Sequence, residues 1–301
     1  MPQLLIVTDA LTPAEKGWGI HPLLDPWRKQ LLRCSRSWFE CGPKTALEWY
    51  AAVSELAPAD IPVTVVKEQL PDSVQQVWIA SPYHAKLIRD QIRVMPDSLL
   101  PWSEQDARWI CELLNPLLRE EGITLLHHRA ALLLACESPI NARPDSFAVV
   151  SGKMLPNRHP DGADGGRLMR LMAEIQMVLS LQPAQHRRAS GEPDIHGLWI
   201  WGGREMRHET AEPEPLAVAT RNPLLMSLVD GKDASLVITD AEQLLQLTQA
   251  QQPLPKQVVL AGDGEAVVLN ASLIPRIGRT AWQPESPGPE IELIHLLRGM
   301  I

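Results

Sequence analysis

The C-terminal part of the chain alternates short apolar runs with helix-like segments, and this pattern constrains the fold most. Apolar runs at 216–219, 235–239 and 257–260 are separated by segments 222–229 and 241–249, whose composition favours helix. A β-α-β-α-β order implies right-handed crossovers and parallel strands in one sheet. We therefore expect an α/β fold with a mainly parallel sheet flanked by helices.

Two further stretches fit the same sheet. Residues 4–7 are apolar and are followed by Asp9, which predicts a buried strand with a carboxylate at its carboxyl end. Ligands of α/β proteins bind at that edge, so Asp9 is a weak candidate metal ligand, although a lone aspartate after a strand more often makes a turn. Residues 262–264 predict a hairpin turn into a strand at 266–269.

The remaining elements follow from apolar periodicity and from caps. The segment 89–94 fits helix or strand, and its alternation favours strand. We treat residues 1–301 as a single α/β unit, with a possible sub-boundary at the linker near 138–144 and an inserted α+β subregion at 60–137. Helices are predicted at about 22–34, 45–56, 103–121 and 167–181, and strands at 63–66, 74–79, 123–128 and 131–136.

Composition narrows the class of protein. The chain has 301 residues, of which 45% are hydrophobic, so it can bury a substantial core. A net charge of -8 argues against nucleic acid or an anionic membrane as partner, because such contacts need clustered Lys and Arg. No signal-like or membrane-length apolar run is present, which predicts a cytoplasmic protein. The four cysteines lack metal or redox spacing; buried free thiols and no cofactor are expected.

The segment 195–203 is the most unusual stretch. Trp199 and Trp201 stand two residues apart, so in a strand both rings leave by one face while apolar neighbours leave by the other. Such a strand should be buried. Gly202 and Gly203 follow it, and they allow close approach of the backbone to a ligand or to another element.

Basic residues precede this strand. Arg187 and Arg188 lie between a predicted helix and the strand. The candidate anion site consists of these two arginines and residues of the strand segment: His196, Trp199, Trp201, Gly202 and Gly203. A guanidinium such as that of Arg188 suits bidentate recognition of phosphate or carboxylate. A solvated basic turn explains the same residues equally well.

A polar loop at 158–166 contains His159, Asp161 and Asp164, which are weak candidate metal ligands. The simpler interpretation is a solvated loop with Asp164 before a helix N-terminus, where a carboxylate is favoured. Although the loop is glycine-rich, its carboxylates would repel a phosphate, and the Walker lysine pattern is absent.

The tryptophan segment also carries a family resemblance. A spaced set of residues in this region resembles a motif of the archaeal-type cofactor-independent phosphoglycerate mutases, which are members of the alkaline phosphatase superfamily. The residues are Pro183, Arg188, Gly191, His196, Trp199, Trp201 and Gly202. The helix around 174–177, together with 78–94, 113–116 and 236–240, resembles a shorter bacterial group of RpfE-type regulatory proteins, a reduced relative of the mutases. This second resemblance covers roughly residues 75 to 250.

The resemblance implies a reduced mutase-like fold, and the mutase reaction implies a serine nucleophile beside two metal ions. This chain departs from that pattern. Gln185 and His196 replace asparagines, Arg204 replaces the last glycine, and Ala241 follows Asp240 where the superfamily would place a metal-binding histidine. No nucleophile segment is recognisable.

These departures predict a non-catalytic regulatory or binding protein whose partner is a protein or a small phosphorylated ligand. One alternative is a phosphate-ester enzyme that binds phosphate through Arg187, Arg188 and His196 and has a rebuilt metal site at Asp9 and the 158–166 loop. A further alternative is a protein-interaction module whose patch is made by Trp18, Trp27, Trp38, Trp49, Trp102 and Trp109.

Overall fold

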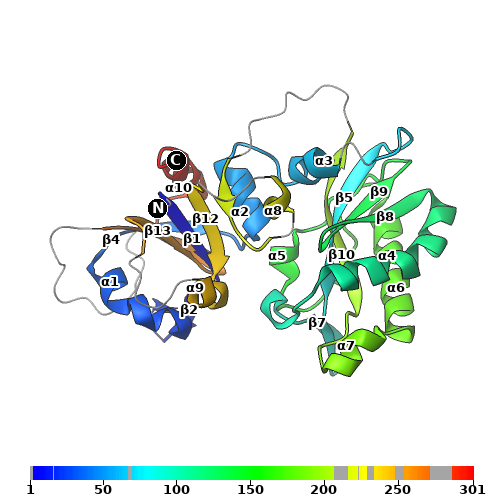
Figure 1. The fold of residues 1–301 in the computed structure, drawn as a ribbon, viewed down its shortest axis with the longest axis horizontal. Helices are drawn as coiled ribbons and strands as arrows, with labels where there is room; N and C mark the ends of the chain where they lie inside the picture. The colour runs from blue at the N-terminus through cyan, green and yellow to red at the C-terminus, as the bar shows by residue number, and fades with distance from the viewer. Residues whose placement is uncertain are drawn as a thin grey trace. The chain divides into compact units, whose positions relative to one another are not determined.

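The computed structural model describes residues 3–15, 17–66, 70–206, 216–222, 224–228, 234–247, 254–271 and 287–301. The chain divides into two compact units, each with its own sheet (Figure 1). Unit 1 is built from residues 1–56 and 214–301, and unit 2 from residues 57–213. The linker-like segment 138–144 lies inside unit 2.

Unit 1 contains a mixed sheet that is parallel over four of its six strands, which confirms the α/β fold class. β1 lies in the middle of the parallel part, with Leu4 opposite both Leu236 and Gln257. The last two strands, β14 and β4, each run antiparallel to their neighbours. β14 is the second strand of the predicted hairpin, and β4 was not predicted. In spatial order the strands are β11 (Val218–Ala219), β12 (Leu236–Asp240), β1 (Leu4–Thr8), β13 (Gln257–Ala261), β14 (Gly264–Asn270) and β4 (Ser35–Cys41).

Helices cover both faces of this sheet. On one face, Leu5 and Val7 of β1 pack in an apolar cluster with Trp27 and Leu244. The alternating residues of β1 point to the other face, where α2 contacts β12 and α10 contacts β4. The helical segments of unit 1 are η1 (Pro22–Trp27), α1 (Arg28–Arg33), α2 (Ala46–Val53), α8 (Leu225–Leu228), α9 (Ala241–Leu247) and α10 (Glu290–Arg298), and a small hairpin pairs β2 (Leu11–Ala14) with β3 (Gly17–Ile20).

Unit 2 is organised around a wholly antiparallel sheet. The tryptophan strand is β10, at one edge, and the predicted hairpin 123–136 supplies β9 and the opposite edge strand β8. α4 (Glu104–Leu118) packs on β8 and α6 (Gly165–Leu181) packs on β10. In spatial order the strands are β10 (Gly197–Glu205), β5 (Gln76–Tyr83), β9 (Ala131–Cys136) and β8 (Ile123–His128), with a separate hairpin of β6 (Ala85–Ile88) and β7 (Gln91–Val94).

The longest capped helix of unit 2 is α4, which begins at a capping box and is followed by a glycine stop. Ser103 caps α4 in a reciprocal capping box with Asp106, and Gly122, at φ +69°, follows the last turn in the left-handed conformation. The helical segments are α3 (Asp60–Val66), η3 (Asp97–Leu99), α4 (Glu104–Leu118), η4 (Arg119–Glu121), α5 (Phe147–Val150), α6 (Gly165–Leu181) and α7 (Gln185–Ser190).

One predicted strand is wrong. The β-branched run at 63–66 belongs to helix α3, because Asp60 and Pro62 favour a helix start and the helix buries Ile61 and Val66 on one side. Strand propensity is thus overridden by a helix-start signal and by burial of a helical face.

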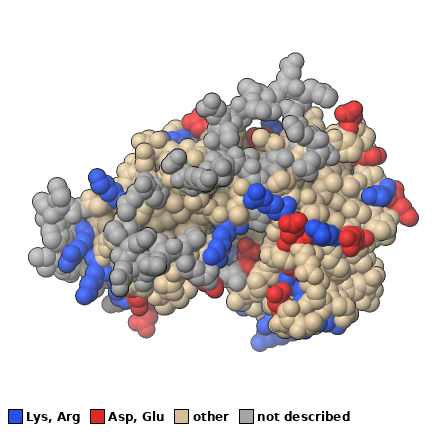
Figure 2. Space-filling model, viewed as in Figure 1, with Lys and Arg blue, Asp and Glu red and all other residues tan. Residues whose placement is uncertain are grey.

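The cysteine prediction is confirmed, since all four thiols are free and buried. Within the described ranges, no helix is long and apolar enough to cross a membrane. On the face in Figure 2, positive and negative side chains are interspersed over unit 2, and its described residues form no broad basic surface there.

Candidate functional site

The tryptophan strand is part of the core of unit 2. Both rings are buried, and each indole N–H has a protein acceptor: that of Trp199 donates to the Asp145 carbonyl at 2.8 Å and that of Trp201 to the Ser81 hydroxyl at 2.9 Å. On the opposite face Leu198 and Ile200 are fully buried beside α6. The burial predicted for this strand is confirmed on both faces.

The two glycines after the tryptophans are explained by packing. The pairing of β10 with β5 shifts between Trp201 and Arg204, and Gly202 takes φ +64° within this bulge. A Cβ on Gly203 would stand 2.5 Å from the Trp78 ring. The backbone therefore approaches a core tryptophan here. Arg204, which replaces the motif's last glycine, forms a 2.7 Å ion pair with Asp60.

Arg187 is wholly buried and its donors are occupied by protein groups. Its Nη1 lies 2.9 Å from a carboxylate oxygen of Asp106 and 3.2 Å from one of Glu192. Its Nε donates to the Pro193 carbonyl and its Nη2 to the Pro101 carbonyl, both at 2.8 Å. These contacts explain how a charged arginine is buried here without a ligand.

Asp106 is the acceptor at the centre of this network. Besides Arg187, it accepts from Ser103 in the capping box of α4, and the Nε2 of His186 lies 2.7 Å from its other oxygen. Burial alone would raise the pKa of Asp106, but the hydrogen bonds from His186, Ser103 and Arg187 outweigh burial and hold that pKa below its usual value. The network ties α7 to the start of α4.

Arg188, in contrast, lies at the surface. Its side chain is 54% exposed and contacts both carboxylate oxygens of Asp194, at 3.2 and 3.4 Å. An anion that binds Arg188 would have to compete with this carboxylate. The anion site predicted for Arg187, Arg188 and His196 therefore stays a prediction, with one buried and one exposed arginine pointing to different partners.

His196 lies in a pair of imidazoles that the sequence did not reveal. Its ring centroid is 4.8 Å from that of His84. The backbone N–H of Ala85 donates to the Nδ1 of His196 at 3.2 Å, while the Nδ1 of His84 lies 2.8 Å from the Asp194 carbonyl. Because a carbonyl only accepts, His84 carries its proton on Nδ1 and neutral His196 carries its proton on Nε2. Burial, and then the nearby His84, lower the pKa of His196.

The carboxyl edge of the unit 1 sheet gathers three carboxylates. Asp9 follows β1 at φ +53°, Asp240 ends β12 beside it, and Asp263 follows β13. Withdrawal from solvent, then the charge of Asp240, raises the pKa of Asp9; His21 lowers it and Asp263 raises it further. The Asp240 carboxylate accepts the Gln243 backbone N–H at 2.7 Å and so caps α9.

The polar loop of unit 2 is fastened to the backbone at 141–143. The Asp164 carboxylate accepts the Asn141 N–H at 2.8 Å, and the Asp161 carbonyl accepts the Arg143 N–H at 2.7 Å. His159 remains exposed. Among the residues that the structure describes, no group of three His, Cys, Asp or Glu side chains is arranged to hold a metal ion, either here or around Asp9.

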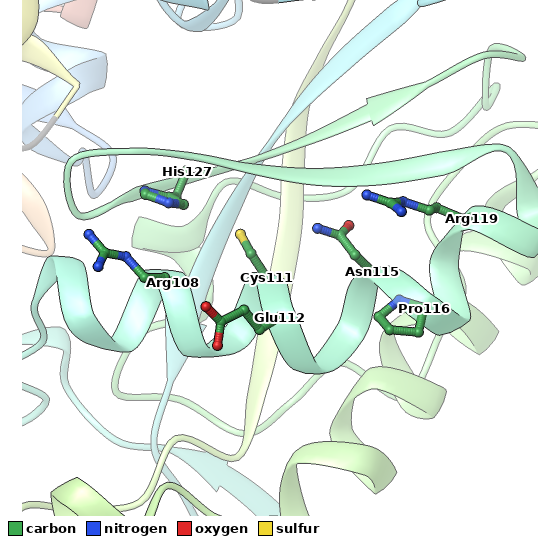
Figure 3. A pocket seen from close by; sticks show the side chains of 7 residues that line it. All are labelled: Arg108, Cys111, Glu112, Asn115, Pro116, Arg119 and His127. Atoms are coloured by element: carbon green, nitrogen blue, oxygen red, sulfur yellow. The ribbon is translucent and has the colours of Figure 1, made fainter.

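A groove that sequence reasoning missed lies between α4 and β8 (Figure 3). Its volume is about 400 Å³. The available signal was a stripe at helical spacing that borders the apolar face of α4, but nothing in the sequence indicated that a strand lies opposite this stripe. The lining residues are Arg108, Cys111, Glu112, Asn115, Pro116, Arg119 and His127.

Comparisons with known proteins give only distant similarities. No protein-family model and no curated protein matches the chain. Two similar solved structures are a protein from Pyrococcus horikoshii (11% identity, TM-score 0.39, 99% of this chain and 97% of that chain) and a cofactor-independent phosphoglycerate mutase from Thermoplasma acidophilum (12% identity, TM-score 0.40, 99% of both chains). TM-scores this low carry no inference on activity. The assignment to the RpfE-type group stays a prediction.

Proposed function

We propose that this chain is a non-catalytic binding or regulatory protein, related to the phosphoglycerate mutases as its tryptophan motif implies. One observation carries the proposal. At the carboxyl edge of the unit 1 sheet, the Asp240 carboxylate is used to cap helix α9, and the next residue, Ala241, is buried. The resemblance would require a metal-binding histidine at position 241.

The state of the motif residues in unit 2 supports the same proposal. Arg187 is committed to Asp106, the two tryptophans bond to protein acceptors, and Gly203 packs on Trp78. These contacts are all to other protein groups, so the residues stabilise the unit. A binding function would use the surface of the protein rather than this strand.

An activity assay tests the proposal. Purified protein is incubated with Mn²⁺ or Mg²⁺ and either 3-phosphoglycerate or p-nitrophenyl phosphate, in parallel with Asp9→Asn. We expect no turnover above the buffer rate from either protein. Turnover by the wild type that Asp9→Asn abolishes would overturn the proposal, because it would show a working metal centre at the β1 edge.

A phosphate-ester enzyme is the second candidate, and one observation favours it. Asp9, Asp240 and Asp263 lie close enough for the latter two to raise the pKa of Asp9, and a bound cation would relieve that repulsion. Calorimetric titration with Mn²⁺ tests this candidate, with Asp25→Asn as the control because Asp25 makes only an exposed ion pair with Arg28. Binding that is lost in Asp9→Asn alone would support it; absence of binding would remove it.

The interaction-module alternative loses its main support. It required exposed tryptophans in the first part of the chain, but Trp27, Trp38 and Trp49 are buried and Trp18 and Trp102 are half-buried, as is Trp109. These rings do not form an exposed aromatic patch.

A further inference from the structure

The groove between α4 and β8 has a rigid floor. The Asn115 amide spans to the edge of β8, where its nitrogen donates to the Leu125 carbonyl at 3.0 Å and its oxygen accepts the Leu125 N–H at 2.8 Å. Cys111, one turn before, is buried. Both side chains point from the helix toward the strand in Figure 3. The floor is therefore fixed by hydrogen bonds that a ligand need not disturb.

Positive charge stands at both ends of this groove. Arg108 and Arg119 lie about three helical turns apart, roughly 16 Å along the axis of α4. Arg119 is exposed and forms no ion pair with another described residue, and Arg108 makes only a solvent-exposed 3.3 Å pair with Glu104. The Glu112 side chain extends along α4 toward the Arg108 end in Figure 3 and does not reach β8. Both guanidinium groups are therefore available to an anion.

The edge of β8 adds a backbone donor. The N–H and carbonyl of Leu125 point toward Asn115 and away from β9. In a strand, residues two positions apart point their backbone groups to the same side, so the N–H and carbonyl of His127 also point away from β9. Within the described part of the chain, the His127 N–H has no hydrogen-bond partner. The His127 ring lies above the Arg108 end of the groove in Figure 3.

We propose that this groove binds an elongated small organic anion with an acidic group at each end. One acidic group contacts Arg108 and the His127 N–H, and the other contacts Arg119. The middle of the ligand lies over Cys111 and Asn115. The Asn115 amide is already bonded to Leu125, so a hydrocarbon spacer fits there. The volume, about 400 Å³, matches small-molecule sites and is too small for a folded partner.

This inference goes beyond the proposed function, because binding here requires no statement about catalysis at Asp9. Carboxylate and phosphonate ends share the chemistry that guanidinium groups recognise. A diacid must reach both arginines to gain from both, so affinity should depend on its length. A monoacid of equal length can contact only one of them.

The test is a calorimetric titration of the intact protein with succinate, suberate, dodecanedioate and an alkane bisphosphonate as long as the best diacid, with octanoate as the monoacid probe. The variants are Arg108→Gln and Arg119→Gln. Arg170→Gln is the matched control, because Arg170 is an exposed arginine on α6 that does not line the groove. Circular dichroism confirms that each variant remains folded.

We expect the longer diacids to bind more tightly than succinate and octanoate, and each groove variant to weaken that binding at least about tenfold, as expected for a lost charge-assisted hydrogen bond. Arg170→Gln should bind like the wild type. Tighter binding of the bisphosphonate would identify phosphate-like ends, and equal binding would leave charge as the determinant; either supports the site. No diacid binding at millimolar concentration, no length dependence, or equal loss in the control would overturn the proposal. The turnover assay with Mn²⁺ is independent of all these outcomes.

Discussion

Replacement of Arg187 by methionine distinguishes a structural arginine from a ligand-binding one. Methionine preserves much of the length and apolar stem but donates no hydrogen bond. The change leaves the Asp106 carboxylate buried without its guanidinium, and it leaves two proline carbonyls without their donor. Removal of one partner from a buried ion pair typically costs 3–5 kcal/mol of folding free energy, and this lies on the order of half of a domain's total stability.

The local structure places the expected value near the lower end of that range. His186 stays 2.7 Å from Asp106 and Ser103 continues to donate to it, so the carboxylate retains part of its stabilisation. We expect a loss of about 3 kcal/mol in the free energy of unfolding of unit 2. Urea denaturation at neutral pH, followed by tryptophan fluorescence and circular dichroism, measures this loss.

The adjacent residue supplies the control. Arg188 has the same side chain and lies on the same helix, but its ion pair with Asp194 is at the surface, so Arg188→Met should cost less than about 1 kcal/mol. Equal losses for the two variants, or a loss below about 1 kcal/mol for Arg187→Met, would refute the reasoning that the buried network is structural. The double variant Asp106→Leu/Arg187→Met should cost less than the sum of the single changes.

Three further predictions follow from the same unit. Gly203→Ala should destabilise unit 2 by about 1–3 kcal/mol in urea denaturation, because the new Cβ would meet the Trp78 ring. The control Gly166→Ala in α6 places a Cβ that meets nothing within 4 Å and should be neutral or stabilising. A larger loss for Gly166→Ala than for Gly203→Ala would contradict the packing argument. The pKa of His196 is lowered in the folded state, so neutral His196 contributes to the free energy of unfolding. This contribution is complete above about pH 6.5 and is lost as the pH falls through the pKa of the folded state. Melting temperatures measured across this range should therefore fall in acid, and less so in His196→Asn, whose amide oxygen can still accept the Ala85 N–H; an unchanged slope would exclude His196 as the cause. Burial raises the pKa of Cys136 to about 12 and that of Cys41 to about 11, so a disulfide reagent should label these two thiols only after unfolding; rapid labelling of either thiol in the native protein would show that it is accessible.

Local patterns predicted the parallel sheet but not its strand order. The alternation at 216–260 implied parallel strands, and the crossover β12–α9–β13 confirms it. The place of β1 between β12 and β13 depends on long-range pairing that no local pattern encodes. At 63–66 propensity was misleading, because Asp60 and Pro62 determine a helix start just before the β-branched run.

The candidate site was harder to predict, for a related reason. Arg187 resembled a ligand-binding residue because its partner Asp106 is 81 positions away along the chain. The glycines after Trp201 suggested room for a ligand, but the space is filled by Trp78 from another strand. The groove of α4 was missed because helical periodicity shows which residues share a face and not what lies opposite that face.

Unit 1 is assembled from both ends of the chain, and this has a consequence for synthesis. During translation, β1 and β4 leave the ribosome first, but β1 must wait for β12 and β13, and β4 must wait for β14. Unit 2 is continuous, and its last residue is made before the first residue of β12. The nascent protein therefore carries a finished antiparallel unit while β1, which is apolar on both faces, is still unpaired; this strand is the part of the chain most in need of protection by a chaperone.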